Sequence, residues 1–86
     1  MYEKEVLVSN PTGLHARPAA LLVALVAKYK SQIGILHNGK KINPRSILNV
    51  MGAGIRSGAT IIISAEGEDE QEAVEALYTL IAEFNE

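Results

Sequence analysis

Apolar residues recur at spacings of three and four between residues 16 and 29, as they do on the buried face of a helix. The positions expected to face the core are Ala19, Leu22, Val23, Val26 and Tyr29. A second such stripe follows Asp69, which together with Glu72 predicts a capping box and a helix that continues to the C-terminus. Its members are Ala73, Val74, Leu77, Leu80, Ile81 and Phe84. The pattern therefore predicts two amphipathic helices.

Alternation of polar and apolar residues predicts strands in other segments. Residues 2–9 and 31–37 alternate approximately and include β-branched side chains. Residues 59–65 contain three successive isoleucines, which favour a central strand. After the second of these strands, Asn38-Gly39 favours a two-residue hairpin turn into a short strand over residues 40–43.

Pro44 ends the short strand, because proline cannot donate a hydrogen bond to a sheet. A brief helix is then expected over residues 46–51, with Ser46 as its N-cap. The resulting order β-α-β-β-α-β-α predicts an α+β two-layer sandwich in one domain, residues 1–86. Its sheet should be four-stranded and mainly antiparallel, with the helices on one face.

Composition narrows the classes of function. The chain has no cysteine, which excludes a disulfide framework and a thiolate zinc site and favours a reducing cytoplasm. Its longest apolar run, residues 19–27, has nine residues, whereas a membrane-spanning helix needs about 20. The first residues do not resemble a signal peptide. We therefore expect a soluble cytoplasmic protein with no membrane insertion.

The charges are distributed unevenly. Residues 1–65 hold eight cations against two carboxylates, a net charge of +6, whereas residues 66–86 hold eight carboxylates and no Lys or Arg. No Asp or Glu occurs from Val6 to Ala65, so a site in this stretch has no local carboxylate for general acid–base catalysis or for a hard metal ion. We expect no metal and no cofactor there.

His15 is the candidate for chemistry within that stretch. It precedes the predicted helix, and Pro18 suits the first helical turn, where its missing N–H costs no hydrogen bond. Arg17 and the helix N–H groups favour a neutral, nucleophilic imidazole and an attached anion such as a phosphoryl group. The alternative is a structural or merely exposed histidine, which is the commoner role of a lone histidine.

Two other features admit a functional interpretation beside a plain structural one. Ser46 could be only an N-cap, or a phosphorylation site that adds about −1.5 to −2 charges next to Arg45. The outer face of the first helix is unusually apolar and is either a docking surface or more deeply buried than expected. Direct binding of nucleic acid is not expected, because aromatic residues do not accompany the lysines and the last helix is acidic.

Two separated motifs give the chain a specific resemblance. One motif is Gly13-Leu14-His15-Ala16-Arg17-Pro18-Ala19, and the other is Arg45-Ser46-Ile47. Together they resemble the pattern of the HPr family of phosphocarrier proteins, which belong to the phosphoenolpyruvate-dependent sugar phosphotransferase system. Asn38-Gly39-Lys40, Val50-Met51 and the order of elements extend the resemblance to the whole chain. It implies an open-faced β-sandwich with strand order 1-4-2-3.

The resemblance also implies roles for individual residues. His15 would accept a phosphoryl group at Nδ1 from enzyme I and pass it to a sugar-specific enzyme IIA, with Arg17 as the active-centre arginine. Ser46 would be modified by an HPr kinase/phosphorylase, and the modified form would bind a catabolite control regulator. Partners would dock on Ala20, Leu21, Ala24, Ile47, Leu48 and Met51. Such a carrier depends on partner transferases and is not a complete enzyme alone.

The chain departs from the family pattern after Ser46. Leu48-Asn49 stands where the family usually has methionine-glycine, Gly52-Ala53 where it often has serine-leucine, and Pro44 is unusual. These differences keep a second reading open, a paralogue that acts mainly as a regulatory binding module. Retention of His15 with Arg17 favours a working carrier, because regulatory paralogues that gave up sugar transport lack this histidine.

Overall fold

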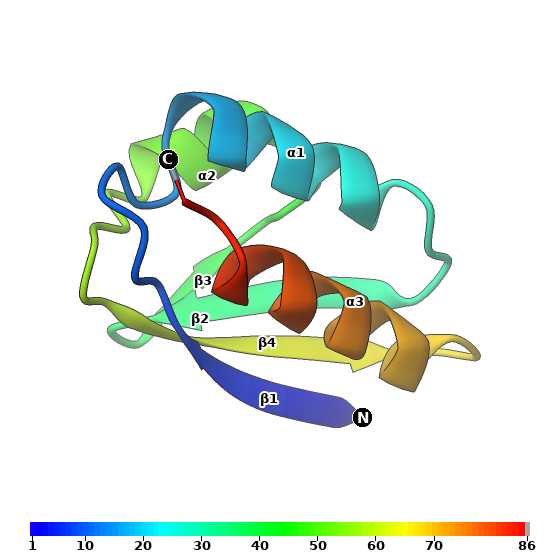
Figure 1. Ribbon diagram of the computed structural model, residues 1–86. Helices are drawn as coiled ribbons and strands as arrows, with labels where there is room; N and C mark the ends of the chain where they lie inside the picture. Colours follow the sequence, from blue (N-terminus) through cyan, green and yellow to red (C-terminus); the bar gives the residue numbers. More distant parts are fainter. Residues whose placement is uncertain (86) are drawn as a thin grey trace.

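Four antiparallel strands and three helices make up the computed structural model, which describes residues 1–85. The elements are β1 (Tyr2–Leu7), α1 (Ala16–Val26), β2 (Gln32–His37), β3 (Lys40–Ile42), α2 (Ile47–Gly52), β4 (Thr60–Glu66) and α3 (Glu70–Ala82). The sheet has the order β1-β4-β2-β3, and all helices lie on one of its faces (Figure 1). The predicted α+β class, the open-faced sandwich and the strand order 1-4-2-3 are confirmed.

The three successive isoleucines lie in β4, between β1 and β2, as expected for a central strand. Ile61 and Ile63 point toward the helices and are fully buried, whereas Ile62 between them faces the uncovered side and is half-buried. Such alternation follows from the two-residue period of a strand. The sheet therefore has one face in the core and one face without a covering layer.

The helices close the core with the stripes that the sequence indicates. On α1 the predicted positions Ala19, Leu22 and Val26 are fully buried and Val23 is half-buried against the core. Tyr29 is also half-buried against the core, but it lies beyond the end of α1. On α3 the buried positions are Ala73, Val74, Leu77 and Ile81. Because each helix buries only one stripe, the opposite face of α1 is left for solvent or for partners.

Most element boundaries agree with the sequence to within one residue, but three element ends do not. The last predicted helix continues to the C-terminus, whereas α3 ends at Ala82. The ends of α1 and β1 also differ. The first predicted helix continues to residue 29, whereas α1 ends at Val26. Arg45 lies at this end: its guanidinium donates hydrogen bonds to the backbone oxygens of Tyr29 at 3.0 Å and Ser31 at 3.1 Å, and more weakly to that of Val26 at 3.5 Å. A cation on the terminal carbonyls opposes the negative end of the helix dipole and fixes the exit of the chain.

The predicted capping box at α3 is wrong. Asp69 is the N-cap, but among the described residues its side chain makes no capping hydrogen bond. Its carboxylate instead accepts from the backbone N–H groups of Lys30 and Ser31, both at 2.9 Å, and from the Ser31 hydroxyl. Glu70 supplies a different local contact by accepting from the Gly67 N–H at 3.1 Å. The carboxylate that the local pattern assigns to the start of α3 is therefore bound by donors from the loop after α1.

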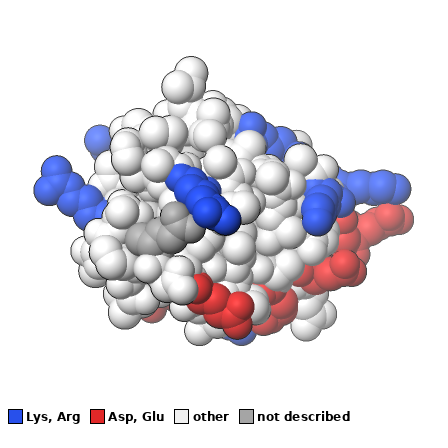
Figure 2. Space-filling view, turned by 45° about the horizontal axis from the view of Figure 1, so that its top comes forward, with Lys and Arg blue, Asp and Glu red and all other residues white. Residues whose placement is uncertain are grey.

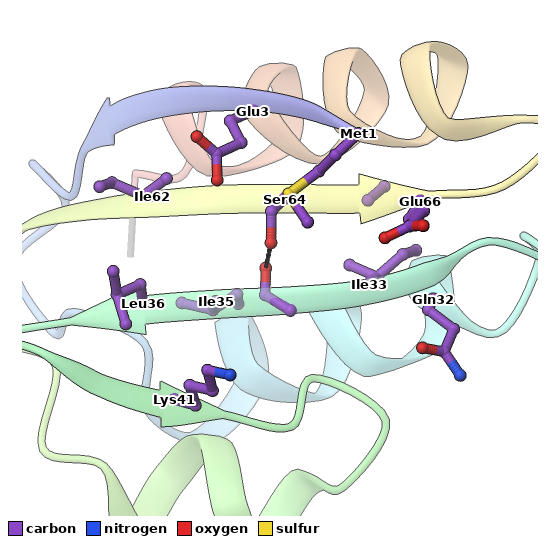
Figure 3. Close-up of a pocket in the computed structure, with 12 residues that line it drawn as sticks. Met1, Glu3, Gln32, Ile33, Ile35, Leu36, Lys41, Ile62, Ser64 and Glu66 are labelled. Carbon is purple, nitrogen blue, oxygen red and sulfur yellow. Dashed lines mark hydrogen bonds between the residues drawn. The ribbon is translucent and has the colours of Figure 1, made fainter.

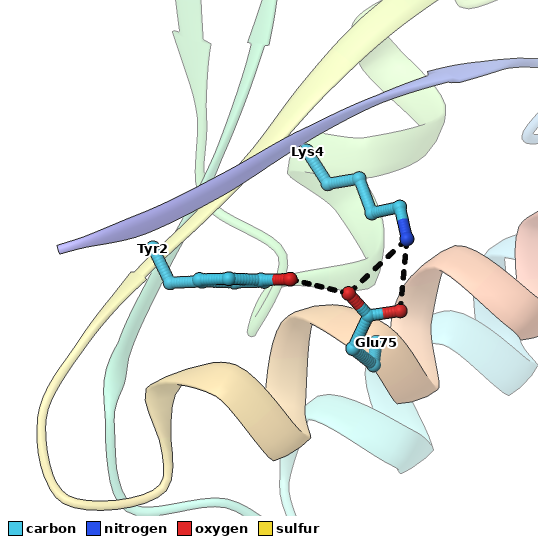
Figure 4. Close-up of polar contacts among 3 residues, drawn as sticks. All are labelled: Tyr2, Lys4 and Glu75. Atoms are coloured by element: carbon cyan, nitrogen blue, oxygen red, sulfur yellow. Dashed lines mark hydrogen bonds and ion pairs between the residues drawn. The ribbon is translucent and has the colours of Figure 1, made fainter.

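β1 also ends earlier than expected, at Leu7 instead of residue 9. Val8 still pairs with the segment before β4, because its N–H donates to Ala59 O at 2.8 Å. At its other end, β1 is joined to α3 by polar contacts (Figure 4). Glu75 accepts from the Tyr2 hydroxyl at 2.5 Å and forms an ion pair with Lys4 at 2.9 Å. These contacts, the Tyr2 hydroxyl first, lower the pKa of the Glu75 carboxyl.

Candidate functional site

The loop that precedes α1 lies directly against the backbone of residues 55–56. Gly13 has φ +66°, and a Cβ atom there would come within 2.3 Å of Ile55 O. The next residue, Leu14, donates its N–H to the same oxygen at 3.1 Å and buries its side chain in the core. Glycine is needed at this position both for the backbone conformation and for the close approach.

Asn10 joins the two ends of this loop through hydrogen bonds to Gly13. Its side-chain amide donates to Gly13 O at 2.8 Å, and its backbone oxygen accepts from the Gly13 N–H at 3.1 Å. The side chain of Asn10 is 2% exposed, so these hydrogen bonds are made away from bulk water. Residues 10–14 are thus held at both ends, and the residue that follows them is positioned by a fixed support.

His15 is that residue, and it is the N-cap of α1. Its backbone is extended, with φ −126° and ψ 158°, and its side chain is exposed. Among the described residues the imidazole makes no capping hydrogen bond to the helix. Ala16 then enters the helix with φ 50°, a left-handed conformation that is strained for a residue with a Cβ atom. Backbone strain of this kind concentrates at functional sites.

The first turn of α1 has an electropositive environment. Arg17 is exposed in this turn, Pro18 is buried, and the turn contains no Asp or Glu. The unpaired N–H groups of a helix start carry partial positive charge, to which the guanidinium adds a full one. Sequence reasoning therefore located both His15 and Arg17 correctly at the helix start. The surroundings suit a phosphoryl group attached to the imidazole.

Ser46 is the N-cap of α2, as the sequence predicts. Its Oγ atom accepts a hydrogen bond from the Asn49 N–H at 3.2 Å. Asn49 reaches back in turn, because its side-chain oxygen accepts from the Asn43 N–H at 2.7 Å. Asn49, one of the departures from the family pattern, therefore has a structural role in fixing the entry to α2.

The expected docking surface comprises Ala20, Leu21, Ala24, Ile47, Leu48 and Met51. Its members lie on α1 and α2, two helices that contact each other. Ala20, Leu21 and Ala24 are exposed, so the outer face of α1 is not buried in this chain. On α2, Leu48 is 80% exposed and Ile47 is also exposed. Met51 differs from the other members because it is half-buried and packed against the core.

Figure 2 shows the charge around this surface. The face formed by α1 and α2 carries mostly uncharged side chains, with Lys and Arg side chains both within this face and at its edges. The carboxylates gather on the side of α3, in agreement with the acidic C-terminal third of the sequence. A binding surface of exposed apolar side chains interspersed with cations fits a partner that is apolar and acidic at its contact site.

Two features of the site are not evident from the sequence. The support supplied by residues 55–56 depends on a contact between segments about forty residues apart. The sequence places Arg45 beside Ser46, yet its guanidinium is directed to the end of α1. Only the positive φ expected of Gly13 could have suggested that the loop is tightly packed.

Other kinds of site find no support within residues 1–85. No group of three His, Cys, Asp or Glu side chains there is arranged to hold a metal ion. None of the helices in this part of the chain is long and apolar enough to cross a membrane.

Comparisons with known proteins agree with this geometry. Residues 2–83 match the model of a family described as the PTS HPr component phosphorylation site. The phosphocarrier protein HPr of Buchnera aphidicola is 41% identical over 84 residues, which cover 98% of this chain and 99% of the relative. The HPr-like protein Crh of Halalkalibacterium halodurans is 51% identical over 81 residues, covering 94% and 96%.

A solved structure extends the likeness to the fold. The crystal structure of HPr-C-His from Thermoanaerobacter tengcongensis superposes with a TM-score of 0.91 at 47% identity, covering 94% of this chain and 91% of that one. Agreement of this extent in sequence and backbone, together with an exposed histidine at the start of α1, shows that the chain belongs to the HPr family of phosphotransferase-system phosphocarrier proteins.

Proposed function

We propose that the protein receives a phosphoryl group from enzyme I on His15 and passes it to a sugar-specific enzyme IIA. The observation that carries this proposal is the exposed imidazole at the N-cap of α1, on a loop held by Asn10 and Gly13. Membership in the HPr family supports it. The protein would then be a mobile carrier between two transferases of the phosphoenolpyruvate-dependent system.

The chemistry needs one nucleophilic nitrogen from this chain and no general acid or base. In the first step, the lone pair of the His15 Nδ1 atom forms a bond to phosphorus while the bond between phosphorus and enzyme I breaks. In the second step, the new P–N bond breaks as a group on enzyme IIA attacks, and the imidazole regains its lone pair. The phosphoryl group is conserved throughout.

Arg17 and the helix start would stabilise the phosphoryl oxygens between these steps. An exposed helix N-terminus contributes only about 0.3 to 1 kcal/mol to the binding of an anion. Since a carrier must release its group to the next enzyme, weak stabilisation suits the role better than a deep anion pocket. The open position of His15 also lets the active site of each partner surround the phosphoryl group.

Partner enzymes would dock on the apolar surface of α1 and α2. Interfaces place their apolar contacts in the middle and polar groups around the rim. Leu48, as the most exposed member, would contribute more contact area than Met51, which is half-buried. Transferases that carry carboxylates beside an apolar patch would match the Lys and Arg side chains of this surface.

Phosphorylation with phosphoenolpyruvate and enzyme I tests the proposal. The product should be an acid-labile, alkali-stable phosphoprotein, and His15→Ala should abolish its formation. His37→Ala is the matched control, because His37 is the other of the two histidines in the chain, and it should leave the yield unchanged. Arg17→Ala should slow the reaction without abolishing it. An unchanged yield in His15→Ala would overturn the proposal.

A second candidate function is regulation through Ser46, and the position of its hydroxyl favours it. Oγ lies at the start of α2, next to the exposed apolar side chains of Ile47 and Leu48. Transfer of the γ-phosphoryl group of ATP to Oγ, with loss of the hydroxyl proton, would add about −1.5 to −2 charges to this part of the docking surface. The similarity to an HPr-like protein Crh is a further reason to consider this role.

An HPr kinase/phosphorylase with ATP tests the regulatory role. The expected product is an acid-stable phosphoserine that is absent in Ser46→Ala and that strengthens binding to a catabolite control transcription regulator. Ser57→Ala is a suitable control, because Ser57 is an exposed serine in a different loop. Absence of label at Ser46 would count decisively against this function while leaving the carrier function intact.

A further inference from the structure

The uncovered face of the sheet carries one row of side chains that crosses all four strands. Glu5 of β1 pairs with Ile62 of β4, Ile62 with Leu36 of β2, and Leu36 with Lys41 of β3. Successive residues of a strand point to opposite faces. The row lies on the open face because its chain neighbours are buried beneath the helices, namely Val6, Ile35, Ile42 and Ile61.

The middle of the row is apolar. Leu36 is 37% exposed and Ile62 is half-buried, and Figure 3 shows both on the open face in line with Lys41. Leu7, which is 53% exposed, lies on the same side of β1 as Glu5. Beside the row the surface is hollowed where Gly34 faces Ser64. Neighbouring exposed apolar side chains on an uncovered sheet face are a feature of contact surfaces.

The two ends of the row carry opposite charges. Glu5 and Lys41 are both exposed, and within residues 1–85 neither forms an ion pair. Lys4, the chain neighbour of Glu5, points to the opposite face and is paired with Glu75. From β1 to β3, the side chains of the row are therefore acidic, apolar, apolar and basic.

Such a row is complementary to itself when its direction is reversed. Consider a two-fold axis that runs parallel to the strands, midway between β4 and β2. It would bring two open faces together so that β1 of one copy lies over β3 of the other, and β4 over β2. Glu5 of each copy would then face Lys41 of the other, and Ile62 would face Leu36. An axis perpendicular to the strands would instead place Glu5 over Glu5. Charge therefore favours the first of these two symmetric arrangements. In it both copies use the same surface, as in other isologous interfaces.

We propose that the open face of the sheet binds a second copy of this chain in the first of these arrangements. Strands spaced about 4.8 Å apart with a rise of about 3.3 Å per residue give a face of about 400 Å² per copy. A standard interface buries about 800 Å² per partner, so the dimer belongs to the weak, transient class. We expect dissociation constants of about 0.1 to 1 mM.

This dimer is compatible with the carrier function. His15 and the docking surface lie on the helical side of the molecule, and the open face lies on the other side (Figure 1). Both copies would keep their phosphorylation sites exposed. The interface is therefore independent of the proposed phosphoryl transfer, and its test can fail without affecting that proposal.

Charge reversal at the two ends of the row tests the dimer. Glu5→Lys would bring a second ammonium group over Lys41, and Lys41→Glu would place two carboxylates together, so each variant should self-associate about tenfold more weakly than the wild type. An equimolar mixture of the two variants restores both ion pairs and should associate as strongly as the wild type. Sedimentation equilibrium up to millimolar concentration measures all three constants.

The controls separate this interface from other causes. Glu72→Lys and Lys28→Glu make the same charge changes at exposed helical positions, and mixing them should give no gain over the wild type. The double variant Glu5→Lys/Lys41→Glu should recover self-association, which shows that the variants fold. A wild type that stays monomeric at millimolar concentration, or a Glu5→Lys and Lys41→Glu mixture no stronger than the control mixture, overturns the proposal. Dimers that persist after dilution also overturn it, because a weak, transient interface dissociates on dilution.

Discussion

Asp69 accepts hydrogen bonds from both the backbone N–H and the hydroxyl of Ser31, so the start of α3 binds the loop that follows α1. Arg45 binds the same loop from another element through the backbone oxygens of Tyr29 and Ser31. Donors and acceptors of residues 27–31 are thus satisfied from two sides. The end of α1 is fixed to the sandwich, and with it the direction of the helix that presents His15.

Removal of the Asp69 carboxylate should destabilise the protein. Asp69→Ala leaves the N–H groups of Lys30 and Ser31 without their acceptor and should lower Tm by about 5 °C at neutral pH. Glu68→Ala, at the exposed neighbouring position, should leave Tm nearly unchanged. Thermal unfolding followed by circular dichroism compares the two. Equal effects of both variants would show that the contact contributes nothing specific.

The same contact predicts a dependence on pH. The Ser31 hydroxyl, followed by the Lys30 N–H, lowers the pKa of the Asp69 carboxyl in the folded protein. A lowered folded-state pKa means that the stabilisation is present above the unfolded value of about 4 and is lost as the pH falls through the folded value. The difference in Tm between wild type and Asp69→Ala should therefore be constant from about pH 5 to 8, and should shrink in acid. A difference that grows on acidification would contradict this.

Arg45 should act on the end of α1. Arg45→Ala removes the hydrogen bonds to Tyr29 and Ser31 and should lower the free energy of unfolding by about 1 to 2 kcal/mol. Amide hydrogen exchange should accelerate most in residues 27–31. Lys28→Ala, at an exposed position in the same segment, is the control and should not change the pattern. Acceleration confined to α2 would mean that Arg45 serves Ser46 instead.

Gly13 should be sensitive to a single methyl group. Gly13→Ala combines an unfavourable positive φ with a clash against Ile55 O, and should lower the free energy of unfolding by about 3 kcal/mol. Gly54→Ala has nearly the same φ, +69°, and meets no atom within 4 Å in the described structure, so about 1 kcal/mol is expected. Urea unfolding measures both. The excess for Gly13 should be accompanied by slower phosphorylation of His15, because the supporting loop shifts.

Substitutions at Leu48 and Val50 should distinguish an effect on partner docking from an effect on stability. Leu48 is 80% exposed, so Leu48→Ala should change the free energy of unfolding by less than about 0.5 kcal/mol while raising the KM of enzyme I for this protein. Val50, two residues later, is fully buried, and Val50→Ala should cost about 2 kcal/mol of stability. An unchanged KM in Leu48→Ala would remove Leu48 from the docking surface.

Features that depend on a local pattern could be predicted from the sequence alone. The core positions of α1, the hairpin at Asn38-Gly39 and the N-cap at Ser46 all follow from spacing and turn chemistry within a few residues. The strand order came instead from the resemblance to the HPr family, because periodicity does not state which strands become neighbours. The placement of His15 and Arg17 at the helix start likewise needed only local signals.

Two of the features that the sequence misjudged involve long-range partners. The local pattern assigns the carboxylate of Asp69 to its own helix, but it binds donors 38 and 39 residues earlier in the chain. The sequence likewise associates Arg45 with the neighbouring Ser46, but its acceptors lie 14 and 16 residues away at the end of α1. A local pattern shows that a side chain can cap or pair, whereas the fold decides which donor or acceptor is nearest.

Transfer of the phosphoryl group to a second protein tests the carrier function most directly. Phosphorylated protein, freed of enzyme I and phosphoenolpyruvate, is mixed with a sugar-specific enzyme IIA, and the label on each chain is followed over time. The expected result is rapid loss of label from His15 and its appearance on enzyme IIA, with little free phosphate. Label that stays on this chain, or that is released as phosphate at the same rate with and without enzyme IIA, would contradict the carrier function.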